Sequence, residues 1–261
     1  MIGMATFAEA HYRDKLFALV SGQTEWLDLG CGHQLLPGWL RSAESDQREL
    51  SARCRRLVGI DASSADLERH SYLHERVVGD IHHLPFPDNS FTLLTARSVV
   101  EHIEQPVPFL REAGRVLRPG GQLLFATPNF LYYQFLVASV MPEAVKLRLI
   151  KFFENRQEED VFKTYYRLNT CRRVEKLARE SGFDVESLDT IECLPEFGRL
   201  GRPIEGIEKA VISLLRHRWL RSFRAVIVAV LRKPLAAGGF PVHITSVADA
   251  LADVKSTQEK V

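Results

Sequence analysis

Short apolar runs rich in strand-forming residues alternate with helical patterns along most of the chain, and this alternation most constrains its fold. It is typical of a mostly parallel sheet covered by helices, so we expect an α/β fold. Seven strands are predicted, at residues 25–30, 56–61, 75–79, 91–96, 122–127, 183–191 and 224–232. Helices are predicted at residues 37–50, 63–70, 107–117, 170–181 and 204–220.

The composition is that of an ordinary globular protein. The chain has 261 residues, of which 46% are hydrophobic and 26% charged, so it is long enough to bury a core without disulfides. Lys and Arg number 34 and Asp and Glu 33, so the formal net charge is 34 − 33 = +1. A near-neutral chain gives no reason to expect nucleic-acid binding, which relies on clustered Lys and Arg.

Four cysteines are scattered along the chain, at Cys31, Cys54, Cys171 and Cys193. No two of them form a C-x-x-C pair, so no metal site is predicted, and their spacing fits a reducing compartment. The N-terminal residues lack a basic segment followed by an apolar core, and no apolar run approaches the roughly 20 residues that span a bilayer. We therefore expect a cytoplasmic protein; the sequence predicts no oligomeric state.

One segment departs from the alternating pattern. Residues 128–169 hold nine of the 24 aromatic residues; an insertion this long and this aromatic is expected to be structured or functional. Two interpretations stay open: a helical cap packed on the sheet, or a lid that shapes an apolar acceptor pocket. A lid would also allow peripheral membrane contact through residues 130–153. We expect one domain over residues 1–235 with this insertion, followed by a polar, disordered tail at 236–261.

The first predicted strand runs into Asp28-Leu29-Gly30-Cys31-Gly32. Two glycines one residue apart allow a ligand to approach the backbone, and a strand-to-helix turn directs N–H groups at it. The dinucleotide fingerprint G-x-G-x-x-G would need a third glycine where Leu35 stands, which disfavours a nicotinamide cofactor. The alternative interpretation is a tight turn without a ligand.

Acidic residues follow the next two strands. Asp61 ends the second strand, where a carboxylate can accept hydrogen bonds from both ribose hydroxyls. Asp80 and Ile81 follow the third strand, and together they offer an acceptor and an apolar face that would suit an adenine. Each acid taken alone could also be a helix N-cap or a turn residue.

The ordered series EWLDLGCG, LVGID, GDIHHLPFPDNSF, SVVEHI, RVLRPGG and ATPN resembles class I S-adenosylmethionine-dependent methyltransferases. The resemblance is strong over residues 25–127 and general over 170–232. It implies a three-layer sandwich with strand order 3-2-1-4-5-7-6, strand 7 antiparallel. It also implies S-adenosylmethionine as the cofactor, bound by Asp28, Gly30, Cys31, Gly32, Asp61, Ala62, Asp80, Ile81 and Arg97.

The chain departs from the family pattern in two places. Gln34 stands where the family often has a further glycine, and Asp28 and Asp61 are 61 − 28 = 33 residues apart, a long interval for such acids. We attribute the interval to an enlarged first helix and loop over residues 39–56.

His102, just past the fourth strand, is the candidate general base, because its ordinary pKa suits proton transfer near neutral pH. The alternative is a structural role at a helix start. Tyr132, Tyr166 and Arg167 are the candidate acceptor contacts. Residues 11–13 near the N-terminus are a candidate flap over the cofactor.

We therefore expect methyl transfer to a small-molecule, lipid-linked or glycan-linked acceptor. Two other functions stay open. One is an NAD(P)-dependent oxidoreductase, which would share the sheet and the ribose-binding acid. The other is a non-catalytic cofactor-binding scaffold at a membrane surface.

Overall fold

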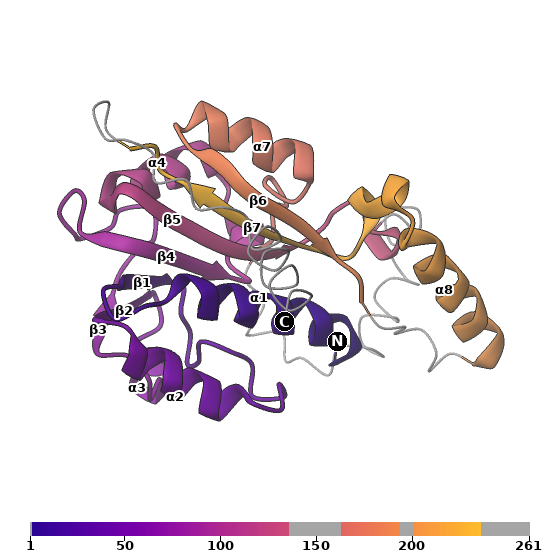
Figure 1. The fold of residues 1–261 in the computed structure, drawn as a ribbon, viewed down its shortest axis with the longest axis horizontal. Helices are drawn as coiled ribbons and strands as arrows, with labels where there is room; N and C mark the ends of the chain where they lie inside the picture. Colours follow the sequence, from indigo (N-terminus) through magenta and orange to yellow (C-terminus); the bar gives the residue numbers. More distant parts are fainter. Residues whose placement is uncertain (1, 136–162, 194–200, 236–261) are drawn as a thin grey trace, which may run out of the picture.

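The computed structural model describes residues 2–135, 163–193 and 201–235. They form a seven-stranded sheet in the order β3-β2-β1-β4-β5-β7-β6 (Figure 1). Neighbouring strands from β3 to β5 are parallel, whereas β7 runs antiparallel to both β5 and β6. The expected fold class, strand order and direction of strand 7 are confirmed. The strands are β1 (Glu25–Leu29), β2 (Arg56–Asp61), β3 (Glu75–Val78), β4 (Phe91–Arg97), β5 (Leu117–Pro128), β6 (Asp184–Ile191) and β7 (Val226–Arg232).

Helices cover both faces of the sheet and make the three layers. Trp26 on β1 faces a core cluster that includes residues of the helices α1, α2 and α3. Its neighbour Leu27 points to the other face, into a cluster that includes residues of α4 and α7, as the two-residue period of a strand requires. The helices are α1 (Ile2–Leu19), α2 (Ala43–Arg53), α3 (Ser64–Arg69), η1 (Val100–His102), α4 (Pro106–Val116), α7 (Cys171–Glu180), α8 (Arg202–Leu215) and η4 (Arg218–Phe223).

The N-terminal segment is the main element that the sequence interpretation missed. Residues 11–13, expected as a candidate flap, lie inside the 18-residue helix α1. A stripe with a step of four residues is buried on the sheet, made of Ala8, Tyr12, Leu16 and Val20. This spacing places them on one face of a helix.

Three predicted elements differ in extent. The helix predicted at 37–50 begins only at Ala43, because Leu40 and Ala43 donate backbone hydrogen bonds to the carbonyls three residues earlier and continue a series of turns. The strand predicted at 122–127 begins earlier, at Leu117 of β5, and the Gly120 N–H donates to the Lys233 carbonyl in this added part. The helix predicted at 204–220 is divided into α8 and η4.

Two expectations fall outside the described residues: most of the aromatic insertion, at 136–162, and the tail at 236–261. Within the described ranges, no helix combines the length and the apolar character that crossing a bilayer requires.

Candidate functional site

The carboxyl ends of the parallel strands meet at one edge of the sheet, where open α/β sheets bind ligands. The Gly30 N–H, past the end of β1, donates to the Ile60 carbonyl of β2 at 2.8 Å. The Gly79 N–H, past the end of β3, donates to the Asp61 carbonyl at 3.0 Å. The glycine loop, Asp61 and the segment before Asp80 are therefore neighbours, as the sequence predicts.

Gly32 and Asp61 are in direct contact. The Gly32 N–H donates to Asp61 Oδ2 at 2.8 Å, and the Ser63 N–H donates to Oδ1 at 2.9 Å. These two bonds fix the carboxylate at the carboxyl end of β2, half-buried beside the loop.

The two loop glycines have different surroundings. Both have a positive φ, +59° at Gly30 and +53° at Gly32, a conformation that glycine adopts at little cost. A Cβ on Gly30 would lie 2.6 Å from Cγ2 of Val99, whereas a Cβ on Gly32 would meet no atom within 4 Å. Gly30 thus allows close packing inside the protein, and Gly32 leaves open space in which a ligand could approach the backbone.

Asp28 lies beneath the loop in a buried polar cluster. Its side chain accepts a hydrogen bond from the Thr95 hydroxyl, which also accepts one from the Trp26 indole N–H at 2.7 Å. Tyr12 of α1 is buried next to this cluster. Burial raises the pKa of Asp28 to about 7, against the hydrogen bond from Thr95, which lowers it. The site therefore contains a carboxyl group that changes charge near neutral pH.

Arg97, at the end of β4, connects the loop to helix α1. Its Nε donates to the Leu35 carbonyl at 3.2 Å, and its Nη1 lies 3.5 Å from Oε1 of Glu9. The other oxygen of Glu9, Oε2, is buried and has no hydrogen-bond partner among the described residues. Burial raises the pKa of the Glu9 carboxyl. Sequence reasoning missed Glu9, because nothing in the sequence showed that α1 reaches this edge.

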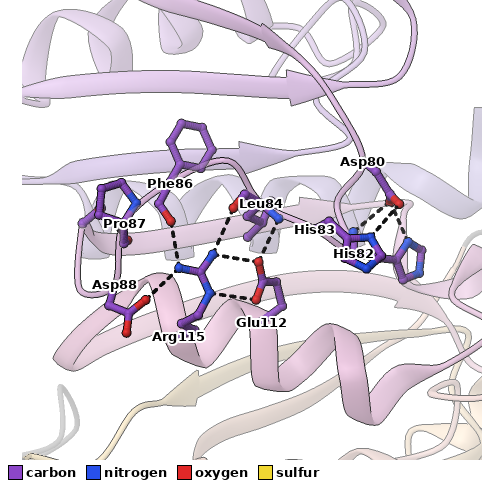
Figure 2. Close-up of polar contacts among 10 residues, drawn as sticks. Asp80, His82, His83, Leu84, Phe86, Pro87, Asp88, Glu112 and Arg115 are labelled. Atoms are coloured by element: carbon purple, nitrogen blue, oxygen red, sulfur yellow. Dashed lines mark hydrogen bonds and ion pairs between the residues drawn. The ribbon is translucent and has the colours of Figure 1, made fainter.

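Asp80 lies at the same edge, after β3 (Figure 2). Its Oδ1 accepts from the His82 N–H at 2.8 Å, and both His82 and His83 direct a ring nitrogen at the carboxylate. The backbone hydrogen bond from His82 is the largest cause that lowers the pKa of Asp80, to about 2. The next residue, Ile81, is partly buried and packs against the core.

Arg115 on α4 holds the loop after Asp80 in place (Figure 2). Its guanidinium donates to the carbonyls of Leu84 and Phe86 at 2.9 and 2.8 Å, and it pairs with Asp88 and Glu112. Glu112 in turn accepts from the Leu84 N–H at 2.8 Å. The sequence segments HLPFPD and REAGR are therefore joined by a clamp that positions the Asp80 loop, a role that the sequence interpretation did not assign.

His102 lies in η1, just after β4, and is partly buried. Its Nδ1 contacts the Lys163 carbonyl at 3.0 Å. A carbonyl only accepts, so Nδ1 carries the proton, and in the neutral ring Nε2 carries the lone pair. The imidazole is thus held in the tautomer in which Nε2 can accept a proton.

The remaining predicted cofactor contacts are Cys31, which is buried, and Ala62, which is exposed. Burial raises the pKa of the Cys31 thiol above its ordinary range, so the sulfur is a packing group and not a thiolate. In the part of the chain that the structure describes, no group of His, Cys, Asp and Glu residues is arranged to hold a metal ion.

Residues 27–125 match the family model of the methyltransferase domain, and they include the glycine loop and both acids of this edge. This part of the chain is similar to methyltransferase domains, and the sheet order is the one expected of the class I, S-adenosylmethionine-dependent fold.

Two curated relatives align beyond this domain. The chain is 27% identical over 184 residues to the malonyl-(acyl-carrier protein) O-methyltransferase of Dechloromonas aromatica, covering 70% of this chain and 62% of that protein. It is 26% identical over 198 residues to the 27-O-demethylrifamycin SV methyltransferase of Amycolatopsis mediterranei, covering 72% of this chain and 64% of that protein. The chain thus spans less than two thirds of either relative.

The fold of the methyltransferase domain is shared with solved structures. The S-adenosylmethionine dependent methyltransferase from Mesorhizobium loti superposes with a TM-score of 0.51 at 18% identity, covering 84% of this chain and 96% of that one. At this identity the similarity establishes the fold.

An aromatic cluster lies beyond the end of β5. Phe130, Phe135 and Tyr166 form an aromatic cluster with ring centroids 5.3–6.0 Å apart. The Tyr166 N–H donates to the Glu101 carbonyl, next to His102. The aromatic cluster is therefore anchored to the backbone beside the candidate base.

The candidate acceptor residues lie in different environments. Tyr132 is 1% exposed, with its hydroxyl against the Cys193 sulfur in a core cluster. Tyr166 is partly buried with a φ of +51°, and Arg167 is exposed with its guanidinium 5.9 Å from the Tyr165 ring. Tyr166 thus lies in the aromatic cluster, and Tyr132 packs in the interior.

Proposed function

We propose that this chain transfers a methyl group from S-adenosylmethionine to an oxygen of a small-molecule or lipid-linked acceptor. The observation that carries the proposal is the contact between Gly32 and Asp61, which brings an open glycine turn and an acid together at the ligand-binding edge of the sheet. An oxygen acceptor is supported by the two relatives, whose names specify O-methylation and a 27-O-demethyl substrate.

The cofactor-binding residues are proposed from their positions. Asp61 would accept from the ribose hydroxyls, Asp80 and Ile81 would contact the adenine, and Gly30 and Gly32 would border the methionine part. Asp28 would stabilise the ammonium group from beneath the loop, and Arg97 with Cys31 and Ala62 would complete the surroundings. When bound, the cofactor supplies a methyl group on a sulfonium sulfur, which departs as a neutral thioether.

Little further chemistry is needed from the protein. Alignment of the acceptor and exclusion of water supply most of the rate enhancement. In the proposal, the aromatic cluster of Phe130, Phe135 and Tyr166 borders an apolar acceptor, with Arg167 at its exposed rim and Tyr132 supporting it from the core. His102 Nε2 would accept the proton from the acceptor hydroxyl, with the ring held by the Lys163 carbonyl. Membrane contact is expected through residues 130–153, of which the structure describes only those up to Phe135.

Calorimetric titration tests the cofactor assignment. We expect S-adenosylhomocysteine to bind and NAD to give no heat; heat with NAD alone would overturn the proposal. Asp61→Asn removes one acceptor oxygen and should weaken S-adenosylhomocysteine binding about tenfold or more, consistent with roughly 1.5–3 kcal/mol for a hydrogen bond to a charged group. Asp88→Asn, an exposed acid on the Arg115 clamp, is the control and should bind within about twofold of the unmodified chain, because roughly 0–1 kcal/mol is typical of an exposed pair.

Turnover requires a second experiment. The chain is incubated with methyl-labelled S-adenosylmethionine and fractionated cell extract, and the labelled product is isolated. Label in a small-molecule or lipid fraction at an ether or ester oxygen would support the proposal. Cofactor binding without label in any fraction would favour the non-catalytic scaffold, and label confined to nucleic acid would contradict the acceptor class.

A further inference from the structure

The near-zero net charge of the chain hides an uneven distribution. Residues 202–224 contain six Arg or Lys residues and two Glu residues, a formal charge of 6 − 2 = +4, so the rest of the chain sums to 1 − 4 = −3. Two of the six, Arg216 and Arg224, pair with Glu192 outside this segment. This segment comprises helix α8, the short helix η4 and Arg224, which Figure 1 shows at one end of the molecule, away from the three layers. We call it the α8–η4 unit.

The α8–η4 unit is also where exposed apolar side chains gather. Five of the ten large hydrophobic residues that are exposed among the described residues lie in it. Ile207 is 67% exposed, Leu214 57% and Trp219 79%. Ile204, Ile207 and Leu214 lie at steps of three and seven residues, so they form a single ridge along α8.

The ridge does not serve the packing of the helix. Helix α8 already buries a different face, through Glu208, Ile212 and Leu215. The Tyr133 hydroxyl donates to Glu208 at 2.6 Å on that buried face. The outward ridge is therefore an additional apolar surface, of the kind that marks an interaction site.

Exposed basic side chains belong to the same unit as the ridge. The guanidinium of Arg218 lies 5.0 Å from the ring of Trp219, and Arg202 and Arg221 are exposed. A unit that combines an apolar helical ridge, exposed arginines and an exposed tryptophan matches segments that lie in the interface of an anionic bilayer. Docking to the acidic surface of a partner protein would account for the positive charge of the unit. It would not account for a tryptophan side chain that is 79% exposed.

The unit is tied to the acceptor side of the proposed site. The Asn129 side chain, one residue past β5, donates to the carbonyls of Ser222 and Arg224 at 2.8 and 2.7 Å. The aromatic cluster begins at the next residue, Phe130. A surface bound by the unit would therefore lie close to the acceptor region.

We propose that the α8–η4 unit docks the protein on an anionic lipid bilayer, with the ridge and Trp219 in the interface and the arginines at the headgroups. This goes beyond the proposed methyl transfer and involves a different segment from the aromatic insertion. Binding to vesicles needs neither cofactor nor acceptor, so its failure would leave the methyl-transfer proposal standing.

Sedimentation of the full chain with vesicles tests this proposal. We expect binding to vesicles of equal parts phosphatidylcholine and phosphatidylglycerol, weaker binding at high salt, and little binding to phosphatidylcholine alone. The double variant Ile207→Glu, Leu214→Glu should abolish binding. Arg218→Glu with Arg221→Glu should lower the partition coefficient by at least about tenfold, because each basic residue near an anionic surface contributes a factor of roughly five.

The matched controls are Leu235→Glu and Arg48→Glu, exposed apolar and basic positions elsewhere, which should bind like the unmodified chain. Calorimetry with S-adenosylhomocysteine shows that each variant is folded. In the Trp39→Phe background, the fluorescence of Trp219 should shift to the blue on adding anionic vesicles.

Absence of vesicle binding, or equal loss in the control variants, would overturn the proposal. The proposal would also be overturned if the chain does not bind vesicles but binds an acidic carrier protein through the same arginines.

Discussion

Thr95 on β4 faces Asp28 on β1 and donates a hydrogen bond to its carboxyl group in a fully enclosed position. The hydrogen bond lowers the pKa of Asp28, yet burial outweighs it and raises that pKa to about 7. An acid whose folded pKa is raised holds its proton more tightly in the folded state, so its contribution to stability falls as pH rises from 3.8 to about 7. Over this whole pH interval the free energy of unfolding falls by about 4 kcal/mol.

We predict that Asp28→Asn removes this loss of stability with rising pH. Urea unfolding at pH 5 and pH 8 should show that the unmodified chain loses more stability across this interval than the variant, with a difference on the order of 2–3 kcal/mol. Asp80→Asn is the control, because its folded pKa is lowered to about 2 and it stays ionised in both buffers. Equal pH dependence in all three proteins would show that Asp28 is not a buried acid.

The same titration should appear in ligand binding. If Asp28 stabilises the cofactor ammonium, only its ionised form does so, and S-adenosylhomocysteine should bind about tenfold more tightly at pH 7.5 than at pH 5.5. Calorimetry at the two pH values measures this directly. In Asp28→Asn the affinity should be weaker and independent of pH over this range.

Gly32 offers a test in which backbone strain and ligand contact can be separated. Gly32→Ala and Gly182→Ala both place a Cβ in open space at a positive φ, +53° and +82°. Each should therefore destabilise the fold by about 1–2 kcal/mol. Gly32→Ala alone should weaken S-adenosylhomocysteine binding, by about tenfold or more, because its methyl enters the space proposed for the cofactor. Comparable affinities for the two variants would place the ligand elsewhere.

Much of this fold was predictable because its determinants are local. Strand β2 was predicted with its exact ends, since an apolar run stops at Asp61. The helix predicted at 63–70 corresponds to α3, whose cap Ser63 accepts from the Asp66 N–H. The position of Asp61 beside the glycine loop followed from the parallel arrangement of β1 and β2. These features depend on strand periodicity and on where a parallel strand ends.

The features that were missed depend on tertiary contacts. Helix α1 carries apolar residues on more than one face, with Phe7 exposed and Tyr12 buried, so its period is blurred. The pairing of Glu9 with Arg97 joins residues 88 positions apart, and the Arg115 clamp joins α4 to a loop 27–31 positions earlier. Neither partner of such a pair identifies the other from spacing along the chain.

The Arg115 clamp leads to a prediction on both stability and binding. Arg115→Ala leaves the Leu84 and Phe86 carbonyls without their donor and frees the Asp80 loop, so we expect a loss of about 2–4 kcal/mol in unfolding free energy. S-adenosylhomocysteine binding should weaken by several fold. Arg111→Ala, at an exposed position on the same helix, is the control and should change stability by less than about 0.5 kcal/mol. If Arg115→Ala and Arg111→Ala behave alike, the clamp is not what holds the loop.

His102 is tested through the rate of methyl transfer, using the acceptor that takes up label. His102→Ala should lower kcat by about 10²–10⁴-fold, the range of general base catalysis, with little change in cofactor affinity. Added imidazole should restore part of the lost rate, because it can replace the missing base. His83→Ala removes a more exposed histidine and should leave kcat unchanged. A purely structural role would instead lower stability, and imidazole would restore no activity.

His70 is fully buried, and its Nε2 has no hydrogen-bond partner among the described residues. Burial lowers its pKa to about 4. A base whose folded pKa is depressed contributes stability that is complete above pH 6.5 and is lost as pH falls from 6.5 to 4, by about 3 kcal/mol. His70→Asn retains an acceptor for the Tyr72 N–H, which His70 Nδ1 now serves, but it cannot become charged. We predict that the variant is slightly less stable at pH 7.5 and loses less stability than the unmodified chain on acidification to pH 4.5, as measured by urea unfolding.

His83→Asn, at an exposed position, is the control and should lose as much stability on acidification as the unmodified chain. If His70→Asn also loses as much, another group causes the loss of stability in acid.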